Sequence, residues 1–93
     1  MPRFYFTYGP DEQYPFCGGW SEVIAANLSE APGLFRGVHP DIHEHILNCA
    51  DFYTYPQMYA SGMLVTRNYG AACHEIVDAE GVHQPPLASE YTA

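Results

Sequence analysis

Alternating apolar and polar positions at the start of the chain predict a pair of strands. Residues 3–8 are dense in aromatic side chains and are followed by a Gly-Pro turn signal, which is typical of a strand end. After a loop over residues 9–19, the alternation resumes over residues 20–26. Two strands joined by so short a loop form most simply an antiparallel hairpin, so a hairpin is expected here.

Two capping patterns predict two short helices. Asn27 is followed three residues later by Glu30, and Thr54 is followed three residues later by Gln57, which is the spacing of a capping box. The first helix contains proline and glycine, which lower helix propensity, so we expect tertiary packing to hold it. We expect the second helix to end at Gly62. The apolar residues expected to pack the first helix are Leu28, Ala31, Leu34 and Phe35.

Two further apolar runs complete the pattern. Residues 46–53 form a long apolar run that ends in aromatic residues, which is typical of a central strand. Residues 64–68 are interpreted as a connection and residues 70–78 as the last strand. Beyond residue 80 the chain has two adjacent prolines and no periodicity. We therefore expect a single α+β domain over residues 1–79 and a flexible C-terminal tail over residues 80–93.

The order of these elements is ββαβαβ, which predicts a small single α+β domain. The sheet is expected to have three or four mainly antiparallel strands, with both short helices on one face. A chain of 93 residues and 10.4 kDa has room for one hydrophobic core, and an apolar content of 47% is sufficient to form it. No apolar run approaches the roughly 20 residues that span a bilayer, so we expect a cytoplasmic protein.

The charge balance narrows the classes of partner. Eleven acidic residues stand against three arginines and no lysine, which gives a formal net charge of −8. A protein that binds a nucleic-acid backbone needs several lysine or arginine side chains along one face to neutralise the phosphates. We therefore expect no direct nucleic-acid binding. The same charge repels anionic membranes and favours encounter with a basic protein surface.

Acidic and aromatic residues gather in the segment between the two predicted strands. Tyrosine and tryptophan dominate protein-binding hot spots, so this segment is the predicted contact surface. The alternative is that its aromatic side chains fold onto the sheet of their own domain. The predicted partner-binding residues are Asp11, Glu12, Tyr14, Phe16 and Trp20, with Glu44 as a further member.

A cluster of metal-ligand residue types lies in the middle of the chain. Three histidines and a cysteine fall within eleven residues, and imidazole and thiolate are ligands that zinc prefers. These candidate zinc ligands are His39, His43, His45 and Cys49. Their spacing matches no recognised zinc signature, so a polar loop remains the alternative. No cofactor other than zinc is suggested.

No constellation of catalytic residues is apparent in the sequence. Cys73 is adjacent to His74, but no motif of a thiol enzyme flanks the pair. Three cysteines without a CxxC pair are typical of reduced thiols. The glycine pair at residues 18–19 lacks the lysine and the helix of a phosphate-binding loop. We therefore expect a protein without enzymatic activity.

Five short stretches resemble a set of small, uncharacterised proteins encoded by phages and mobile elements of gut bacteria. They are residues 4–9, 18–20, 34–36, 46–49 and 70–75, with the sequences FYFTYG, GGW, LFR, ILNC and GAACHE. The resemblance implies an accessory role in a mobile element. Small acidic proteins of such elements are often inhibitors of host defence, including anti-CRISPR proteins that occupy the basic nucleic-acid channel of an effector.

Together these observations favour a non-enzymatic acidic binding protein that inhibits a host defence system, of anti-CRISPR type, through protein–protein contact. Its expected partner is a host protein with a basic surface, such as a CRISPR effector, in the bacterial cytoplasm. One alternative is a sponge for a nucleotide signal, in which Arg3, Arg36 or Arg67 meets phosphate and an oligomer supplies the concave site. A second alternative is a zinc-binding protein that uses the histidine and cysteine cluster.

Overall fold

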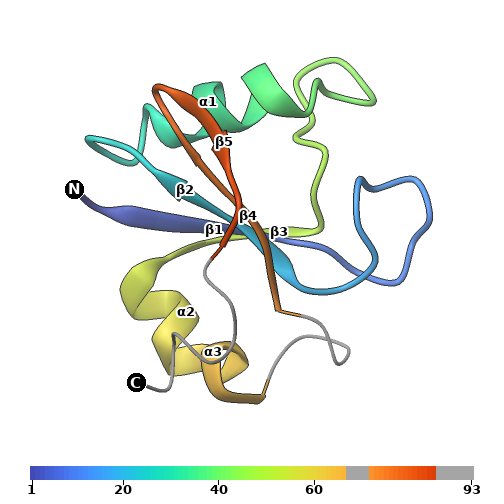
Figure 1. The fold of residues 1–93 in the computed structure, drawn as a ribbon. Coiled ribbons are helices and arrows are strands. Elements are labelled where there is room, and N and C mark those ends of the chain that lie inside the picture. Colours follow the sequence, from blue (N-terminus) through green and yellow to red (C-terminus); the bar gives the residue numbers. More distant parts are fainter. Residues whose placement is uncertain (67–71, 86–93) are drawn as a thin grey trace.

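The computed structural model describes residues 1–66 and 72–85 of the chain (Figure 1). Within these residues it has five strands and three short helices. In chain order they are β1 (Arg3–Thr7), β2 (Trp20–Ile24), α1 (Ala31–Val38), β3 (Asp51–Thr54), α2 (Tyr55–Ser61), α3 (Met63–Thr66), β4 (Cys73–Asp78) and β5 (Gly81–His83). The predicted α+β class is confirmed.

The strands form one mixed sheet in the order β3-β1-β2-β4-β5. The predicted hairpin of β1 and β2 is confirmed, and β1 also pairs antiparallel with β3. β2 and β4 pair in parallel, because the chain returns through α2 and α3 before it enters β4. The predicted ββαβαβ order and the sheet of three or four strands are wrong in detail, since α3 and β5 are added.

The helices lie on opposite faces of the sheet, so the prediction of both on one face is wrong (Figure 1). Successive side chains of a strand point to opposite faces. Phe6 of β1 stacks on Phe35 of α1 with ring centroids 4.3 Å apart, whereas Tyr5 packs on the other face in a cluster with Trp20 and Met58 of α2. Because β1 is aromatic on both faces, each face needs a cover.

The predicted central strand over residues 46–53 is wrong in both extent and place. The strand begins only at Asp51, and β3 lies at the edge of the sheet. The preceding residues Leu47 and Cys49 pack against the core from a loop. β1 and β2 occupy the centre instead, because nearly every side chain in them is buried.

The two capping patterns have different outcomes. The second is confirmed, since the Thr54 backbone N–H donates to Gln57 at 2.9 Å and the helix ends at the left-handed Gly62. The first capping pattern, Asn27 with Glu30, forms a turn that precedes the helix. In this turn the Asn27 side chain accepts a hydrogen bond from the backbone N–H of Glu30. α1 therefore begins at Ala31. Among the residues expected to pack it, Ala31 and Phe35 are buried, Leu34 is partly buried against the core, and Leu28 is exposed.

The C-terminal half shows two further differences from the predicted elements. Part of the predicted connection, Met63–Thr66, is helix α3. The predicted domain boundary at residue 79 falls inside a hairpin, because β5 pairs with β4 and extends the sheet to His83. Residues 67–71 and the last part of the predicted tail, residues 86–93, lie outside the described residues. No helix in the described chain is long and apolar enough to cross a bilayer.

The stacked pair of Phe6 and Phe35 gives the first testable prediction. Phe35→Ala should lower the free energy of unfolding by about 3–5 kcal/mol, because a fully buried ring is lost from a closely packed core. Leu28→Ala is the matched control, and its exposed side chain should make a difference below about 0.5 kcal/mol. Urea denaturation followed by circular dichroism measures both. Equal losses in the two variants would contradict the assignment of this core.

Candidate functional site

Four exposed carboxylates lie at one end of the sheet. Because β1 runs antiparallel to β2 and β3, the end of β1 and the starts of both neighbours meet there. The loop after β1 and the loop before β3 therefore project from the same end, as Figure 1 shows. We call this surface the acidic end and define it by its exposed residues, which are Asp11, Glu12, Glu44 and Asp51. Asp51 was missed in the sequence, where it was assigned to the interior of a strand.

The first of these loops is tied to the sheet by an aromatic stack. Phe16 lies on the ring of His74 with centroids 4.3 Å apart and an interplanar angle of 3°. The Nε2–H of His74 donates to the carbonyl oxygen of Gly18 at 2.8 Å, because a carbonyl can only accept. Tyr14 and Phe16 pack against the core. The two aromatic residues therefore fold onto their own domain, while Asp11 and Glu12 stay exposed.

The glycine pair that closes this loop has a structural role. Gly18 and Gly19 both have φ of 68°, a conformation that residues with a Cβ rarely adopt. A Cβ at Gly19 would overlap the carbonyl oxygen of Ala72 and would lie 2.5 Å from Nε2 of His74. The loop can therefore approach β4 this closely only with glycine at residue 19.

Trp20, predicted as a partner-binding residue, is separated from the loop surface. It is 5% exposed and packs with Tyr5 and Met58 on the α2 side of the sheet. The structure thus brings Asp11 and Glu12 to the same end as Glu44, holds Tyr14 and Phe16 beneath the loop, and removes Trp20 from the surface.

A buried chain of hydrogen bonds connects four elements and was missed by the sequence analysis. The Tyr8 hydroxyl donates to Ser21 Oγ at 2.7 Å, and Ser21 donates to Glu75 Oε2 at 2.6 Å. His39 Nε2 contacts the same carboxylate oxygen at 2.5 Å from the end of α1. Ser21 and Glu75 are paired in the β2–β4 register, 54 residues apart in sequence. Only the pairing of these strands could have revealed the contact.

The order of groups in this chain bears on its chemistry. In the serine–histidine–carboxylate triad, the histidine takes the proton of the serine and the carboxylate lies behind that histidine. Here the carboxylate of Glu75 lies between Ser21 and His39, and Ser21 donates its proton to the carboxylate. Burial raises the pKa of Tyr8 and keeps it a donor. These contacts stabilise the buried carboxylate of Glu75, because burying a carboxylate costs free energy unless it is hydrogen-bonded.

The three cysteines differ in exposure. Cys17 is exposed in the first loop, whereas Cys49 and Cys73 are half-buried, and all three are free thiols. Burial raises the pKa of Cys49 to about 12 and that of Cys73 to about 11. Because the thiolate is the nucleophile, the two half-buried thiols are poorly suited to covalent chemistry at neutral pH.

The predicted zinc ligands are not gathered into one group. His39 is engaged by Glu75, His43 and His45 are exposed, and Cys49 packs against the core. Their ligand atoms do not meet within the distance expected for a shared ion anywhere in the described chain.

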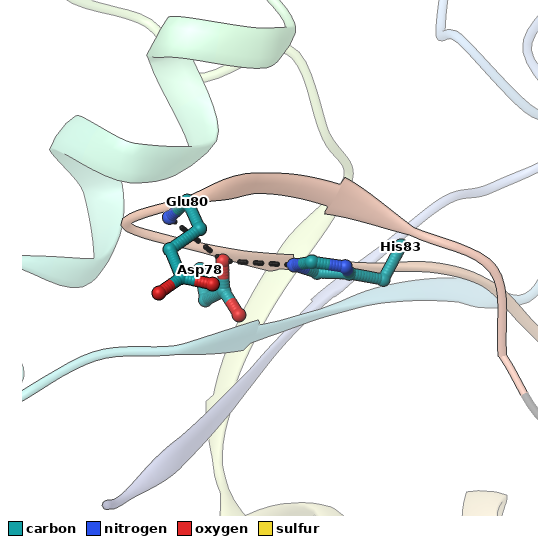
Figure 2. A group of neighbouring side chains, drawn as sticks. All are labelled: Asp78, Glu80 and His83. Carbon is teal, nitrogen blue, oxygen red and sulfur yellow. Dashed lines mark hydrogen bonds and ion pairs between the residues drawn. The ribbon is translucent and has the colours of Figure 1, made fainter.

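Figure 2 shows the trio of residues whose ligand atoms do come together, at the β4–β5 hairpin. The ligand atoms of Asp78, Glu80 and His83 lie within 4.8 Å of one another. Asp78 accepts hydrogen bonds from the Glu80 backbone N–H at 2.8 Å and from His83 Nε2 at 3.0 Å. The bond from His83 lowers the pKa of Asp78. These bonds close the turn and account for the arrangement without an ion.

Both described arginines are paired with carboxylates of the same chain. Arg3 contacts Glu22 at 3.2 Å, and the Tyr5 hydroxyl donates to the same carboxylate oxygen at 2.9 Å. Arg36 contacts Asp41 at 3.0 Å. Arg67 lies outside the described residues. A shallow groove of about 470 Å³ beside Arg3 is lined by Met1, Pro2, Arg3 and Tyr55.

Comparison with protein-family models, with curated proteins and with solved structures gave no match to this chain.

The close approach at Gly19 yields a stability prediction. Gly19→Ala should lower the free energy of unfolding by about 2–4 kcal/mol, because the new methyl group meets a backbone carbonyl in a left-handed conformation. Gly37→Ala in α1 is the matched control, since nothing outside its own helix lies within 4 Å of the place that its Cβ would occupy. It should be neutral or stabilising by up to about 1 kcal/mol. Thermal unfolding of the three proteins measures the difference, and two indistinguishable variants would refute the tight contact.

The thiols give a reactivity prediction with a defined sign. A thiol with pKa near 11 is about 0.1% thiolate at pH 8, so Cys49 and Cys73 should react slowly there and faster as pH rises. The exposed Cys17 should be modified first by iodoacetamide. Peptide mass spectrometry over time assigns each site, with a denatured sample as control. Equal rates at the three sites in the folded protein would contradict the burial described here.

Proposed function

We propose that this chain is a non-enzymatic binding protein that presents its acidic end to a basic surface of a partner protein. The observation that supports this most directly is the distribution of charge. Both described arginines are neutralised within the chain, whereas Asp11, Glu12, Glu44 and Asp51 are exposed at one end of the sheet. Of these carboxylates, Glu44 lies 3.3 Å from Nε2 of the exposed His45, and none of the four contacts an arginine that the structure describes. A surface rich in exposed carboxylates attracts cationic partners and speeds their encounter.

The way in which the loop between β1 and β2 is held in place also favours binding of a partner protein. Ordering a loop on binding costs conformational entropy, which a loop already fixed does not lose again. The stack of Phe16 on His74 and the left-handed glycine pair hold the loop that carries Asp11 and Glu12. These two carboxylates are therefore presented from a preorganised backbone.

The partner class follows from the resemblance described above. We propose an inhibitor of a host defence system, encoded by a phage or mobile element and acting in the bacterial cytoplasm. A CRISPR effector is the favoured target, because its nucleic-acid channel is a basic surface that carboxylates can occupy. The proposed inhibition needs contact alone and no chemical step.

The alternative functions have less support. A nucleotide sponge needs free cations for phosphate, but Glu22 lies against Arg3 beside the groove and would repel an anion. A zinc protein built on the histidine and cysteine cluster would need ligands that the fold leaves apart. An enzyme is not favoured, since Ser21 donates to Glu75 and the half-buried thiols have raised pKa values.

The test is a charge-reversal experiment against purified CRISPR effectors. The double variant Asp11→Lys with Glu12→Lys should weaken binding at least 10-fold, mainly through slower association, and should abolish protection of phage in cells with active CRISPR immunity. Binding by the unchanged protein should also weaken as salt rises. Biolayer interferometry and plaque counts provide the two measurements.

The matched control makes the same change in net charge at another part of the surface. Glu30→Lys with Glu80→Lys makes the net charge more positive by the same four units, at exposed positions in the β2–α1 loop and the β4–β5 turn. This control should retain most of the binding. Equal weakening by both double variants would show a general charge effect and refute the acidic end, and no binding to any effector would refute the proposed target.

A further inference from the structure

The loop between α1 and β3 contains a short turn in which every residue is exposed. The turn covers residues 42–46, with the sequence IHEHI, and the backbone N–H of Ile46 donates to the carbonyl oxygen of His43 at 3.0 Å. Ile42 is 41% exposed and Ile46 is 59% exposed, and the exposed Glu44 stands between them in the sequence. Two large aliphatic side chains therefore meet solvent next to a carboxylate of the acidic end.

Both sides of this turn are held by contacts within the chain. Before the turn, the Nε–H of Arg36 donates to both carboxylate oxygens of Asp41 at 3.0 Å. After the turn, Leu47 and Cys49 pack against the core. The base of the turn is thus fixed to α1 and to the core, and the loop between α1 and β3 projects beyond the end of α1 (Figure 1).

The backbone of the turn has an unfavourable conformation at its third residue. His45 has φ of 66° and is the one residue other than glycine with a positive φ in residues 1–66 and 72–85. Glycine or asparagine is favoured at this position of a turn, because a Cβ is strained in the left-handed conformation. The side chain of His45 is 88% exposed, so burial does not explain the strain. Retained backbone strain is concentrated at binding and catalytic sites, which makes this turn a candidate binding segment.

The charge around the turn limits what can cover its two isoleucines. Asp11, Glu12 and Asp51 are exposed at the same end of the sheet as Glu44. A second copy of the chain would place these carboxylates against their equals, and an anionic lipid surface would be repelled. A cationic protein surface is attracted by the same carboxylates. The occupant that fits both features is a basic protein surface with apolar side chains beside its lysine or arginine residues.

We propose that residues 42–46 are the apolar anchor of the acidic end, and that its partner is a basic protein segment that also offers apolar side chains. Ile42 and Ile46 are buried against those apolar side chains, while Glu44 meets a cation of the partner. The carboxylates speed association, whereas burial of the isoleucines slows dissociation. This inference rests on the binding role proposed for the acidic end, and it adds the kind of basic surface that the acidic end selects.

Three synthetic peptides of equal length test the proposal by isothermal titration calorimetry with the full chain. One alternates lysine with leucine, one alternates lysine with serine, and one alternates glutamate with leucine. The lysine–leucine peptide should bind at least 10-fold more tightly than the lysine–serine peptide, because it alone combines positive charge with apolar surface. Equal affinity for the two lysine peptides, tight binding of the glutamate–leucine peptide, or no binding of any peptide up to about 1 mM overturns the proposal.

Variants of the turn locate the contact. Ile42→Ser with Ile46→Ser should lower the affinity for the lysine–leucine peptide to that for the lysine–serine peptide, and should leave the affinity for the lysine–serine peptide unchanged. Leu28→Ser with Val82→Ser is the matched control, because these apolar side chains are 53% and 47% exposed in other parts of the chain. Circular dichroism checks that each variant is folded. An equal loss of affinity in the two double variants would refute the turn as the anchor.

The charge-reversal variant separates this inference from the proposed function. Asp11→Lys with Glu12→Lys should weaken binding of both lysine peptides by the same factor, since it changes the charge and leaves the isoleucines in place. If it weakens neither, the binding role of the acidic end is wrong and the anchor falls with it. If it weakens both but the serine variant binds the lysine–leucine peptide normally, the anchor alone is wrong. Binding to phosphatidylcholine vesicles that the serine variant loses would assign the turn to a membrane and also overturn the proposal.

Discussion

The two-sided burial of β1 is the constraint on which the rest of the structure depends. Its aromatic side chains alternate between the two faces of the sheet, and every residue from Phe4 to Thr7 is buried. One face is covered by Phe35 of α1 and the other by Met58 of α2. A chain of 93 residues has little else with which to cover both faces, so each short helix takes one face although neither has strong helix propensity.

Burying the central strands also brings polar groups into the interior. Glu22 and Glu75 lie on neighbouring strands at 6% exposure, and each has donors that offset the cost of removing a carboxylate from water. Arg3 donates to Glu22, whereas Ser21 donates to Glu75 and His39 contacts the same Glu75 oxygen. Of the two arginines that the structure describes, Arg3 is thus used to pair a buried carboxylate. Of the other described acidic residues, Asp11, Glu12, Glu44 and Asp51 are exposed and contact neither described arginine.

The surface divides into regions of different chemistry as a consequence. The acidic end is formed by loops that enter and leave the central strands, so its position follows from the antiparallel pairing of β1 with both neighbours. Helices α2 and α3 lie beyond the other end of β3 and expose uncharged aromatic and apolar side chains. The carboxylates of the acidic end and the uncharged side chains of α2 and α3 are therefore separated by the length of β3.

Features encoded within a few residues were accessible from the sequence: the β1–β2 hairpin, the Thr54 capping box, the stop at Gly62 and the α+β class. These depend on neighbouring residues, whose spacing fixes their geometry. Strand order, the assignment of helices to faces and the place of Trp20 required the tertiary structure, because an apolar residue packs equally well on either face until its partners are known. The bond of Ser21 to Glu75 was likewise decided by strand pairing, since the parallel register of β2 and β4 joins residues that no local pattern connects.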